Sequence, residues 1–182
     1  MRRYVRCKMN GATYFFTTVT YNRRPILNSD LAIECLRAAF KRVSKERPFK
    51  MIAICVLPDH LHSIWAMPKA DNDFSTRWRL IKSYFTRSFI QRSGIVGNRS
   101  KSRKQSKEQP IWQRRFWERL VRDEEELQRC VDYVHFNPLK HGLVTRLADY
   151  PWSSFHRFVR RGTYDPDWGG EIEFSDSTLF GE

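Results

Sequence analysis

The feature that most constrains this fold is an alternation of short apolar runs with amphipathic helical segments. Aromatic and β-branched runs of strand length predict four strands, over residues 13–21, 51–57, 60–66 and 111–121. Apolar residues at helical spacing predict three helices, over residues 29–47, 75–93 and 124–137. The order β-α-β-β-α-β-α predicts an α+β, ferredoxin-like sandwich, with an antiparallel sheet and helices on one face.

Capping residues mark the ends of these helices. Asn28 or Ser29 can cap the first helix, which Pro48 ends, and Ser75 can cap the second, which Gly94 closes. Asp123 with Glu126 three residues later resembles a capping box for the third helix. Because Asn137 precedes Pro138, we expect this helix to end there.

Length and composition predict one folded domain. The chain has 182 residues, and 41% of them are hydrophobic, which excludes wholesale disorder. We expect a domain over 1–164 and an acidic tail over 165–182. No apolar run could span a bilayer and no secretory signal is evident, so we expect a cytoplasmic protein without a membrane partner. The four cysteines lie far apart, which favours buried, reduced thiols.

The basic charge is concentrated in one part of the chain. The net charge is +13, and residues 77–122 hold fourteen Lys and Arg against two acids, whereas residues 165–182 hold six acids and no base. Such a basic segment favours a polyanionic partner, most simply nucleic acid. Residues 97–109, rich in Ser, Lys and Arg, are predicted to form a mobile loop that orders on a partner.

Basic residues interleaved with aromatic ones provide the predicted nucleic-acid interface. Cations would bind phosphates, and aromatic rings could stack on unpaired bases. For the ring at position 112, core packing is an equally good interpretation. The predicted contacts are Arg23, Arg24, Lys82, Arg87, Lys101, Arg103, Lys104, Trp112, Arg114, Arg115, Arg119 and Arg122.

Two histidines on a predicted strand form a candidate metal site. His60 and His62 are two residues apart, and side chains alternate along a strand, so both imidazoles lie on one face. Such a pair can hold a divalent cation, although taken alone it is more often two structural histidines. The other histidines have no partner pattern, and we expect them to be structural.

The third predicted helix places a tyrosine beside an amide. At about 100° per residue, Tyr133 and Asn137 are neighbours on one flank, bordering the apolar face without being buried in it. By themselves they are equally consistent with a packing tyrosine and a helix-stop residue.

These residues resemble a known family. Residues 57–62 (LPDHLH) resemble the HUH motif, in which a bulky apolar residue separates two histidines. Residues 133–144 (YVHFNPLKHGLV) are similar to the single-tyrosine signature of bacterial insertion-sequence transposases. Residues 150–155 (YPWSSF) match a segment of the REP-associated tyrosine transposases. The similarity covers residues 13–158, with the three motifs in the right order.

The resemblance implies an RRM-like HUH nuclease fold and a complete reaction. His60 and His62 would hold Mg²⁺ or Mn²⁺, Asn137 matches the place of a third ligand, and Tyr133 would be the nucleophile. The substrate would be single-stranded DNA folded into a hairpin, the repetitive extragenic palindrome (REP). The enzyme would act in transposition and DNA recombination, as a monomer or homodimer beside the bacterial nucleoid.

General chemistry completes this hypothesis. Neutral imidazoles leave the ion its full charge and favour Mn²⁺ over Mg²⁺. Attack by a tyrosine would make a 5′-phosphotyrosine and a free 3′-OH, and no acid in the motifs is an obvious general base. The alternatives are a non-catalytic RRM-like module that binds single-stranded nucleic acid, and an HUH relaxase or replication initiator.

Overall fold

A four-stranded antiparallel sheet forms the centre of the computed structural model, which describes residues 8–169. Its strands are β1 (Thr13–Val19), β2 (Lys50–Val56), β3 (His60–Ala66) and β4 (Trp117–Val121). They are arranged in the order β2-β3-β1-β4, with every neighbouring pair antiparallel. The predicted α+β sandwich on an antiparallel sheet is therefore confirmed.

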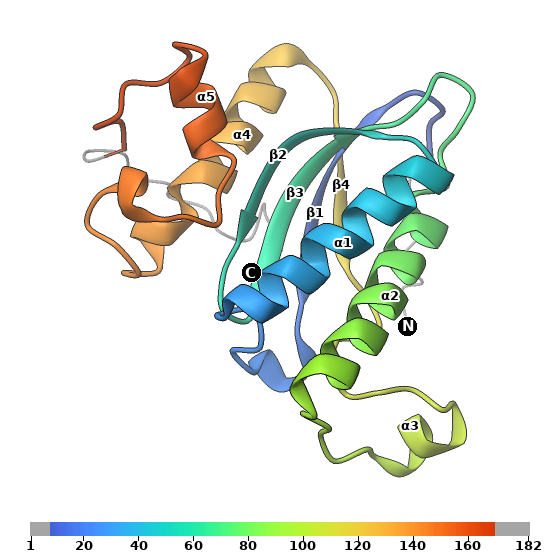
Figure 1. Ribbon diagram of the computed structural model, residues 1–182. Coiled ribbons are helices and arrows are strands. Elements are labelled where there is room, and N and C mark those ends of the chain that lie inside the picture. The colour runs from blue at the N-terminus through green and yellow to red at the C-terminus, as the bar shows by residue number, and fades with distance from the viewer. Residues whose placement is uncertain (1–7, 170–182) are drawn as a thin grey trace, which may run out of the picture.

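Helices cover both faces of this sheet. On one face lie α1 (Asp30–Glu46) and α2 (Phe74–Ser93), packed against each other and over a core that includes Phe16 and Trp65 (Figure 1). On the other face lies α4 (Glu124–Lys140), over a second core that includes Phe15 and Ile64. The expectation that the helices share one face thus holds for α1 and α2, and α4 departs from it.

A third layer covers the outer side of α4. It consists of the short helices η2 (Leu147–Asp149) and α5 (Phe155–Arg160) with the turns around them (Figure 1). Leu147, Tyr150, Phe155 and Tyr164 belong to the same apolar cluster as the inner face of α4. As a result α4 is buried on two sides, which a one-sided amphipathic helix would not be.

Most of the predicted element boundaries agree with the structure. The Ser29 side chain caps α1, and that of Asp123 caps α4 through the Glu126 amide, as predicted. The predicted cap of α2 is wrong, because Asp73 accepts the Thr76 amide and the helix begins before Ser75. Gly94 ends α2 in the left-handed conformation, at φ +69°.

The first strand ends at Val19, two residues earlier than predicted, and two further elements differ in extent. The strand predicted over 111–121 is shorter, because Trp112 makes only an isolated bridge to Thr20 before β4 begins at Trp117. The third helix does not stop at Asn137: Pro138 lies inside α4, which continues to Lys140. Gly142, at φ +63°, then donates its amide to the Leu139 carbonyl and closes the last turn.

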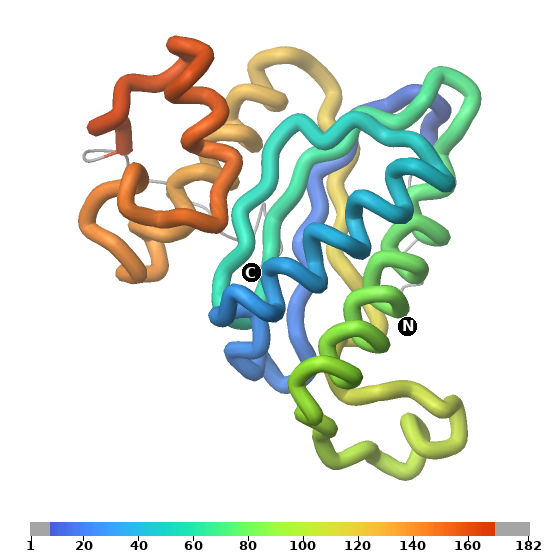
Figure 2. The backbone as a smooth tube through the Cα atoms, in the orientation of Figure 1, coloured from blue at the N-terminus to red at the C-terminus, as the bar shows by residue number. Residues whose placement is uncertain are grey.

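The connection between α2 and β4 projects away from the sheet, past the C-terminal end of α2 (Figure 2). Within the predicted loop 97–109 it forms α3 (Lys101–Gln105), and it buries the Arg103 side chain. The mobility of this segment stays a prediction, and so does the boundary of the acidic tail, of which residues 170–182 lie outside the described part.

The described cysteines Cys35, Cys55 and Cys130 are buried free thiols, as predicted, and Cys7 lies outside the described residues. Among residues 8–169, no helix is long and apolar enough to cross a membrane.

Candidate active site and nucleic-acid interface

The two histidines of β3 face α4, because they share the sheet face of Ile64. Their rings are 4.9 Å apart between centroids, and both side chains are buried. His60 Nδ1 lies 2.5 Å from the Asp59 carboxylate, and His62 Nδ1 lies 2.9 Å from the Thr17 hydroxyl. With Nδ1 of each ring engaged, Nε2 is the nitrogen through which each would coordinate a metal.

Tyr133 and Asn137 lie on the inner side of α4, one turn apart. The Tyr133 ring packs edge-on against His62 at 5.4 Å and against Phe15 at 6.1 Å between centroids. The structure therefore brings the predicted histidine pair and the predicted tyrosine together from two distant parts of the chain, with the predicted amide one turn along α4 from the tyrosine.

The predicted exposure of Tyr133 and Asn137 is wrong. Both have 0% of their surface exposed, rather than bordering the core. The reason is that the sheet covers one side of α4 and the C-terminal layer covers another, so the buried arc is wider than the apolar stripe indicates.

The Asn137 amide is held with its oxygen unpaired. Its Nδ2 donates to the Tyr133 carbonyl at 2.6 Å, while its buried Oδ1 has no hydrogen-bond partner among the described residues. A buried amide oxygen without a donor is costly unless something else binds it. This orphaned oxygen and the oriented imidazoles fit a hard or borderline divalent cation.

The donor set is of mixed type. Within the described part of the chain, no group of three or more His, Cys, Asp and Glu is arranged to hold a metal. A metal here would thus depend on the amide oxygen as well as the two imidazoles.

Two residues at the end of α4 were missed by the motif analysis. Lys140 Nζ donates to the Tyr133 hydroxyl at 2.7 Å and lies 4.8 Å from the centre of its ring. The His141 ring is 5.1 Å from that of His60, although this histidine was expected to be only structural. The seven-residue spacing from Tyr133 to Lys140 is two helical turns, but using that signal required α4 to continue past Pro138.

The predicted structural role fits the other two histidines. His135 is buried among aromatic rings and lies 2.8 Å from the Ser154 hydroxyl. Burial lowers the pKa of His135 to about 3, so the ring is neutral at physiological pH. His156 lies 2.8 Å from the Tyr150 carbonyl.

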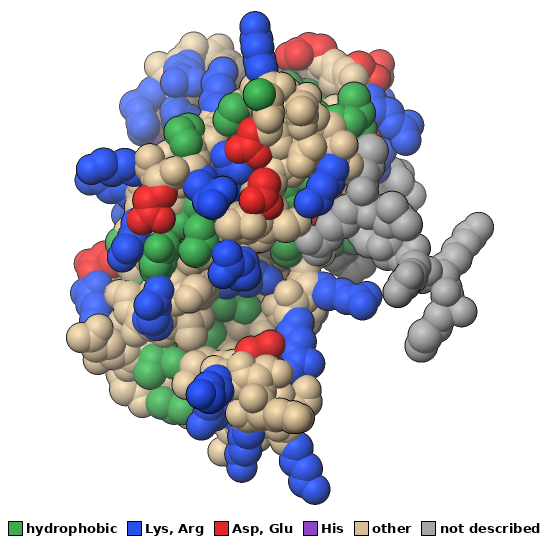
Figure 3. Space-filling model, turned by 90° about the vertical axis from the view of Figure 1, so that its right-hand side faces the viewer, with side chains coloured by type: hydrophobic (Ala, Val, Ile, Leu, Met, Phe, Trp, Pro, Cys, Tyr) green, Lys and Arg blue, Asp and Glu red, His purple; other side chains and the backbone are tan. Residues whose placement is uncertain are grey.

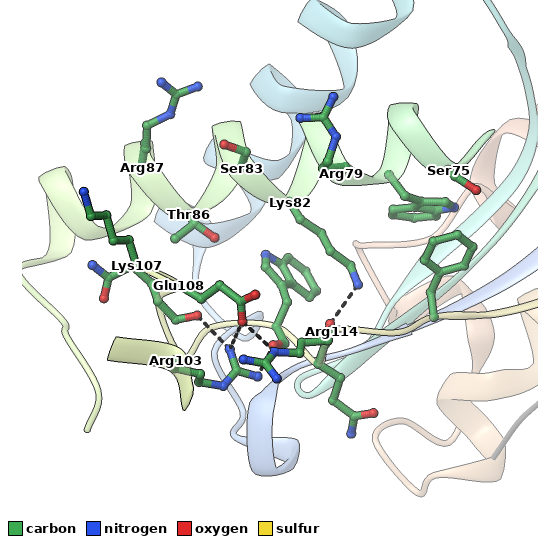
Figure 4. Close-up of a pocket in the computed structure, with 15 residues that line it drawn as sticks. Ser75, Arg79, Lys82, Ser83, Thr86, Arg87, Arg103, Lys107, Glu108 and Arg114 are labelled. Atoms are coloured by element: carbon green, nitrogen blue, oxygen red, sulfur yellow. Dashed lines mark hydrogen bonds and ion pairs between the residues drawn. The ribbon is translucent and has the colours of Figure 1, made fainter. Parts of the chain in front are cut away.

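A basic groove runs along α2 on the other side of the molecule. Its volume is about 730 Å³, and one wall is α2 while the other is the segment from α3 to β4 (Figure 4). It is lined by the predicted contacts Lys82, Arg87, Arg103, Trp112 and Arg114. Arg79 and Lys107 also line it, and Glu108 is its one acidic residue. Arg79, Lys82 and Thr86 are three and four residues apart along α2 and therefore lie on one face of the helix, and this spacing is the sequence signal that could have placed Arg79 beside Lys82 in the groove.

Several of the predicted phosphate contacts instead bind carbonyl or carboxylate groups of the protein. Arg103 is buried and donates to the Gln109 and Trp112 carbonyls, so it shapes the groove. Arg24 donates to the Pro110 carbonyl, and the Arg119 guanidinium pairs with Glu126 at 2.5 Å. These contacts tie the basic segment to the core.

Trp112 is not a stacking platform. It is 5% exposed and packs at 5.0 Å against the Phe85 ring, so the core-packing interpretation holds for it. Its predicted role in stacking on bases is corrected on this ground, because a ring must be exposed to stack on a base.

The remaining predicted contacts lie outside the groove. Lys101, Lys104, Arg115 and Arg122 are exposed, and Arg23 pairs with Asp59 at 3.1 Å. Figure 3 shows Lys and Arg side chains spread over the face that carries α2, with few acidic side chains among them.

Comparison with known proteins identifies the family. Residues 8–137 match the family model described as "Transposase IS200 like". The chain belongs to the IS200-like transposase family.

Relatives of this transposase extend over nearly its whole length. The REP-associated tyrosine transposase of Escherichia coli K12 is 41% identical over 172 residues, covering 94% of this chain and 93% of the relative. A Haemophilus influenzae protein with the same family designation is 40% identical over 170 residues, covering 93% of this chain and 94% of its own. The resemblance inferred from the three motifs is therefore confirmed.

A solved structure shows the same fold. The structure of a REP-associated tyrosine transposase bound to a REP hairpin matches this transposase with a TM-score of 0.77. The two chains are 40% identical, and the match covers 96% of each. The fold of this chain is thus the fold of that solved transposase.

Proposed function

We propose that this transposase is a metal-dependent single-stranded DNA endonuclease and strand transferase that acts on hairpin DNA of the REP type. The observation that carries the proposal is the packing of the Tyr133 ring on His62, with the unpaired Asn137 oxygen one turn further along α4. This contact supports a site between β3 and α4 in which the nucleophile would lie beside the metal donors. The hairpin bound by the related solved structure supports the class of substrate.

His60, His62 and Asn137 are the residues that would hold the metal. A divalent ion bound there would polarise the scissile phosphate and stabilise the charge of the transition state. Because two of the three donors are imidazoles, we propose that Mn²⁺ binds more tightly than Mg²⁺. Asp59 and Thr17 support the site by orienting the two rings through Nδ1.

Tyr133 supplies the nucleophilic oxygen. Its Oη would form a bond to phosphorus while the bond to the 3′ oxygen breaks, and the phenolic proton is balanced by the proton gained at the leaving 3′ oxygen. The products are a 5′-phosphotyrosine and a free 3′-OH. The ester keeps the bond energy, so a second 3′-OH can displace Tyr133 without a nucleotide cofactor.

The DNA backbone would lie along the basic face. The proposed phosphate contacts are cations of the groove and its surroundings. They are the partly exposed Lys82 and the exposed Arg79, Arg87, Lys101, Lys104, Lys107, Arg114, Arg115 and Arg122. The enzyme would act on cellular DNA, and its proposed location is the cytoplasm, beside the nucleoid.

A non-catalytic binding module is the second candidate. It is favoured by the complete burial of Tyr133, since the hydroxyl must reach a phosphate to attack it. The two candidates differ in whether a covalent adduct forms.

The deciding experiment uses an end-labelled hairpin DNA with a single-stranded flank, incubated with the protein and Mn²⁺. We expect an adduct that survives denaturation, and Tyr133→Phe abolishes it while the dissociation constant for DNA stays the same. Tyr84→Phe is the matched control, because this tyrosine lies on α2 and its hydroxyl contacts the exposed Glu46, away from the candidate site. Tight binding without any adduct would favour the module, and an adduct that survives Tyr133→Phe would remove Tyr133 as the nucleophile.

A further inference from the structure

The Lys140 ammonium donates a hydrogen bond to the Tyr133 hydroxyl. Nζ lies 2.7 Å from Oη and 4.8 Å from the ring centroid, so the lysine bends over the ring and ends on its oxygen. The contact exists because Pro138 is accommodated within α4, which keeps Lys140 two turns from Tyr133 on the same helix.

We propose that Lys140 is a catalytic residue that holds the Tyr133 oxygen for attack and neutralises the negative charge that develops on it. This inference rests on the proposed function and assigns Lys140 a role within that reaction. In this role Lys140 acts by hydrogen bonding and charge, not as the base.

The surroundings of the hydroxyl support this role. Tyr133 is fully buried whereas Lys140 is partly exposed, so the ammonium that contacts the hydroxyl belongs to a side chain that also reaches solvent. A phosphate bound at Tyr133 could therefore contact the same ammonium. An ammonium has three N–H donors, and one cation can therefore contact Oη and a non-bridging phosphate oxygen together.

The expected effect of Lys140 on the reaction rate follows from general chemistry. A phenol is protonated at pH 7, since its ordinary pKa is about 10, and it becomes negatively charged only as it attacks. A donor aimed at developing charge in a water-poor site typically contributes about 10²–10³ in rate. The imidazoles beside the ring are neutral ligands in the proposed site, and Lys140 places a positive charge of the protein at the nucleophilic oxygen.

The covalent step balances with Lys140 unchanged. The Oη–P bond forms and the P–O3′ bond breaks. The electron pair of the broken bond goes to the 3′ oxygen, which becomes 3′-OH with a proton, and Tyr133 gives up one proton. In the reverse transfer the ammonium stabilises the departing phenolate, so the same contact serves both directions.

The experiment measures single-turnover adduct formation on the labelled hairpin DNA at saturating protein and Mn²⁺. We expect Lys140→Met to slow the adduct rate by about 10²-fold or more, with the dissociation constants for DNA and Mn²⁺ within about twofold. Lys140→Arg keeps the cation and is expected to recover part of the rate. Arg129→Met is the matched control on the same helix, because this exposed arginine pairs only with Glu125 among the described ion pairs.

Each outcome decides a separate point. A wild-type protein without any adduct refutes the proposed function itself. A wild-type adduct that Lys140→Met forms equally fast refutes only the role of Lys140. A loss confined to DNA affinity makes Lys140 a phosphate contact and overturns the proposal. If Lys140→Met does not fold by circular dichroism, Lys140→Gln and Lys140→Arg provide the same comparison, and equal rates in those two variants refute a role for the charge.

Discussion

The hydrogen bond between Thr17 and His62 offers a sharp test of the proposed metal site. Thr17 lies on β1 directly opposite His62 on β3, and its hydroxyl is 2.9 Å from Nδ1. The change Thr17→Val removes the hydroxyl and keeps the branched shape of the side chain. We expect weaker Mn²⁺ binding, because the His62 ring loses the contact that fixes its orientation and tautomer.

The size of the effect follows from the burial of the pair. Thr17 is 1% exposed and His62 is 0% exposed, so water has no access to replace the lost hydrogen bond. Loss of such a partner typically weakens metal affinity about 10–100-fold, which equals about 1.4–2.7 kcal/mol. The nitrogen left without its partner would also lower the free energy of unfolding by about 1–3 kcal/mol.

The adjacent threonine is a matched control. Thr18 is equally buried but points to the opposite sheet face, and its Oγ1 has no hydrogen-bond partner among the described residues. Thr18→Val therefore removes an unsatisfied hydroxyl and is expected to be neutral or stabilising, with unchanged Mn²⁺ affinity.

Isothermal titration with Mn²⁺ and urea unfolding of both variants supply the measurements. The reasoning is refuted if Thr17→Val binds Mn²⁺ as tightly as the wild type. It is also refuted if Thr18→Val loses as much affinity, since the effect would then come from the strand and not from the imidazole.

Two further predictions concern stability and reactivity. Arg77 is 1% exposed and donates to the carbonyls of residues 47, 48 and 73 and to the Asp71 carboxylate. We therefore expect Arg77→Met to lower the free energy of urea unfolding by about 3–5 kcal/mol. The control Arg79→Met changes an exposed arginine of the same helix and should alter this free energy by less than about 0.5 kcal/mol. Arg77 also holds the pKa of Asp71 below its usual value. The stability that comes from this ion pair is therefore complete above about pH 4 and is lost as the pH falls through the pKa of Asp71 in the folded protein. A difference in unfolding free energy between wild type and Arg77→Met that is no smaller at about pH 3 than at about pH 7 would contradict this. In a Cys7→Ser variant the three remaining thiols are buried, and burial raises the pKa of one of them, Cys130, to about 12. We therefore expect no labelling of this variant by a thiol reagent until urea unfolds the chain. Rapid labelling of the folded variant would show that the core around these thiols opens.

Local patterns were sufficient for the elements of the fold and for the histidine pair. The β3 strand was predicted with its observed bounds, and the two-residue spacing of His60 and His62 put both rings on one face, as found. Caps at Ser29 and Asp123 were also predictable, since a capping side chain binds an amide only three residues away. These features depend on neighbours within a few residues, which a sequence displays directly.

The environment of α4 was not predictable in the same way. An apolar stripe indicates which residues face one core, but α4 is enclosed by the sheet and by the layer of η2 and α5. That enclosure buries Tyr133 and Asn137, and it removed the expected exposed flank. Trp112 shows the same limit, because its aromatic ring is equally suited to a core and to a base.

The sequence by itself determined the presence of four strands, the caps of α1 and α4, the basic segment and the four side chains of the candidate site, because each follows from a short repeat or motif. Only the tertiary structure decided that β3 and α4 face each other, that Pro138 is held within the helix, and that Lys140 thereby reaches the Tyr133 hydroxyl. The physical reason is that contacts between distant segments depend on how whole layers pack, and no local periodicity encodes which layer will cover which face.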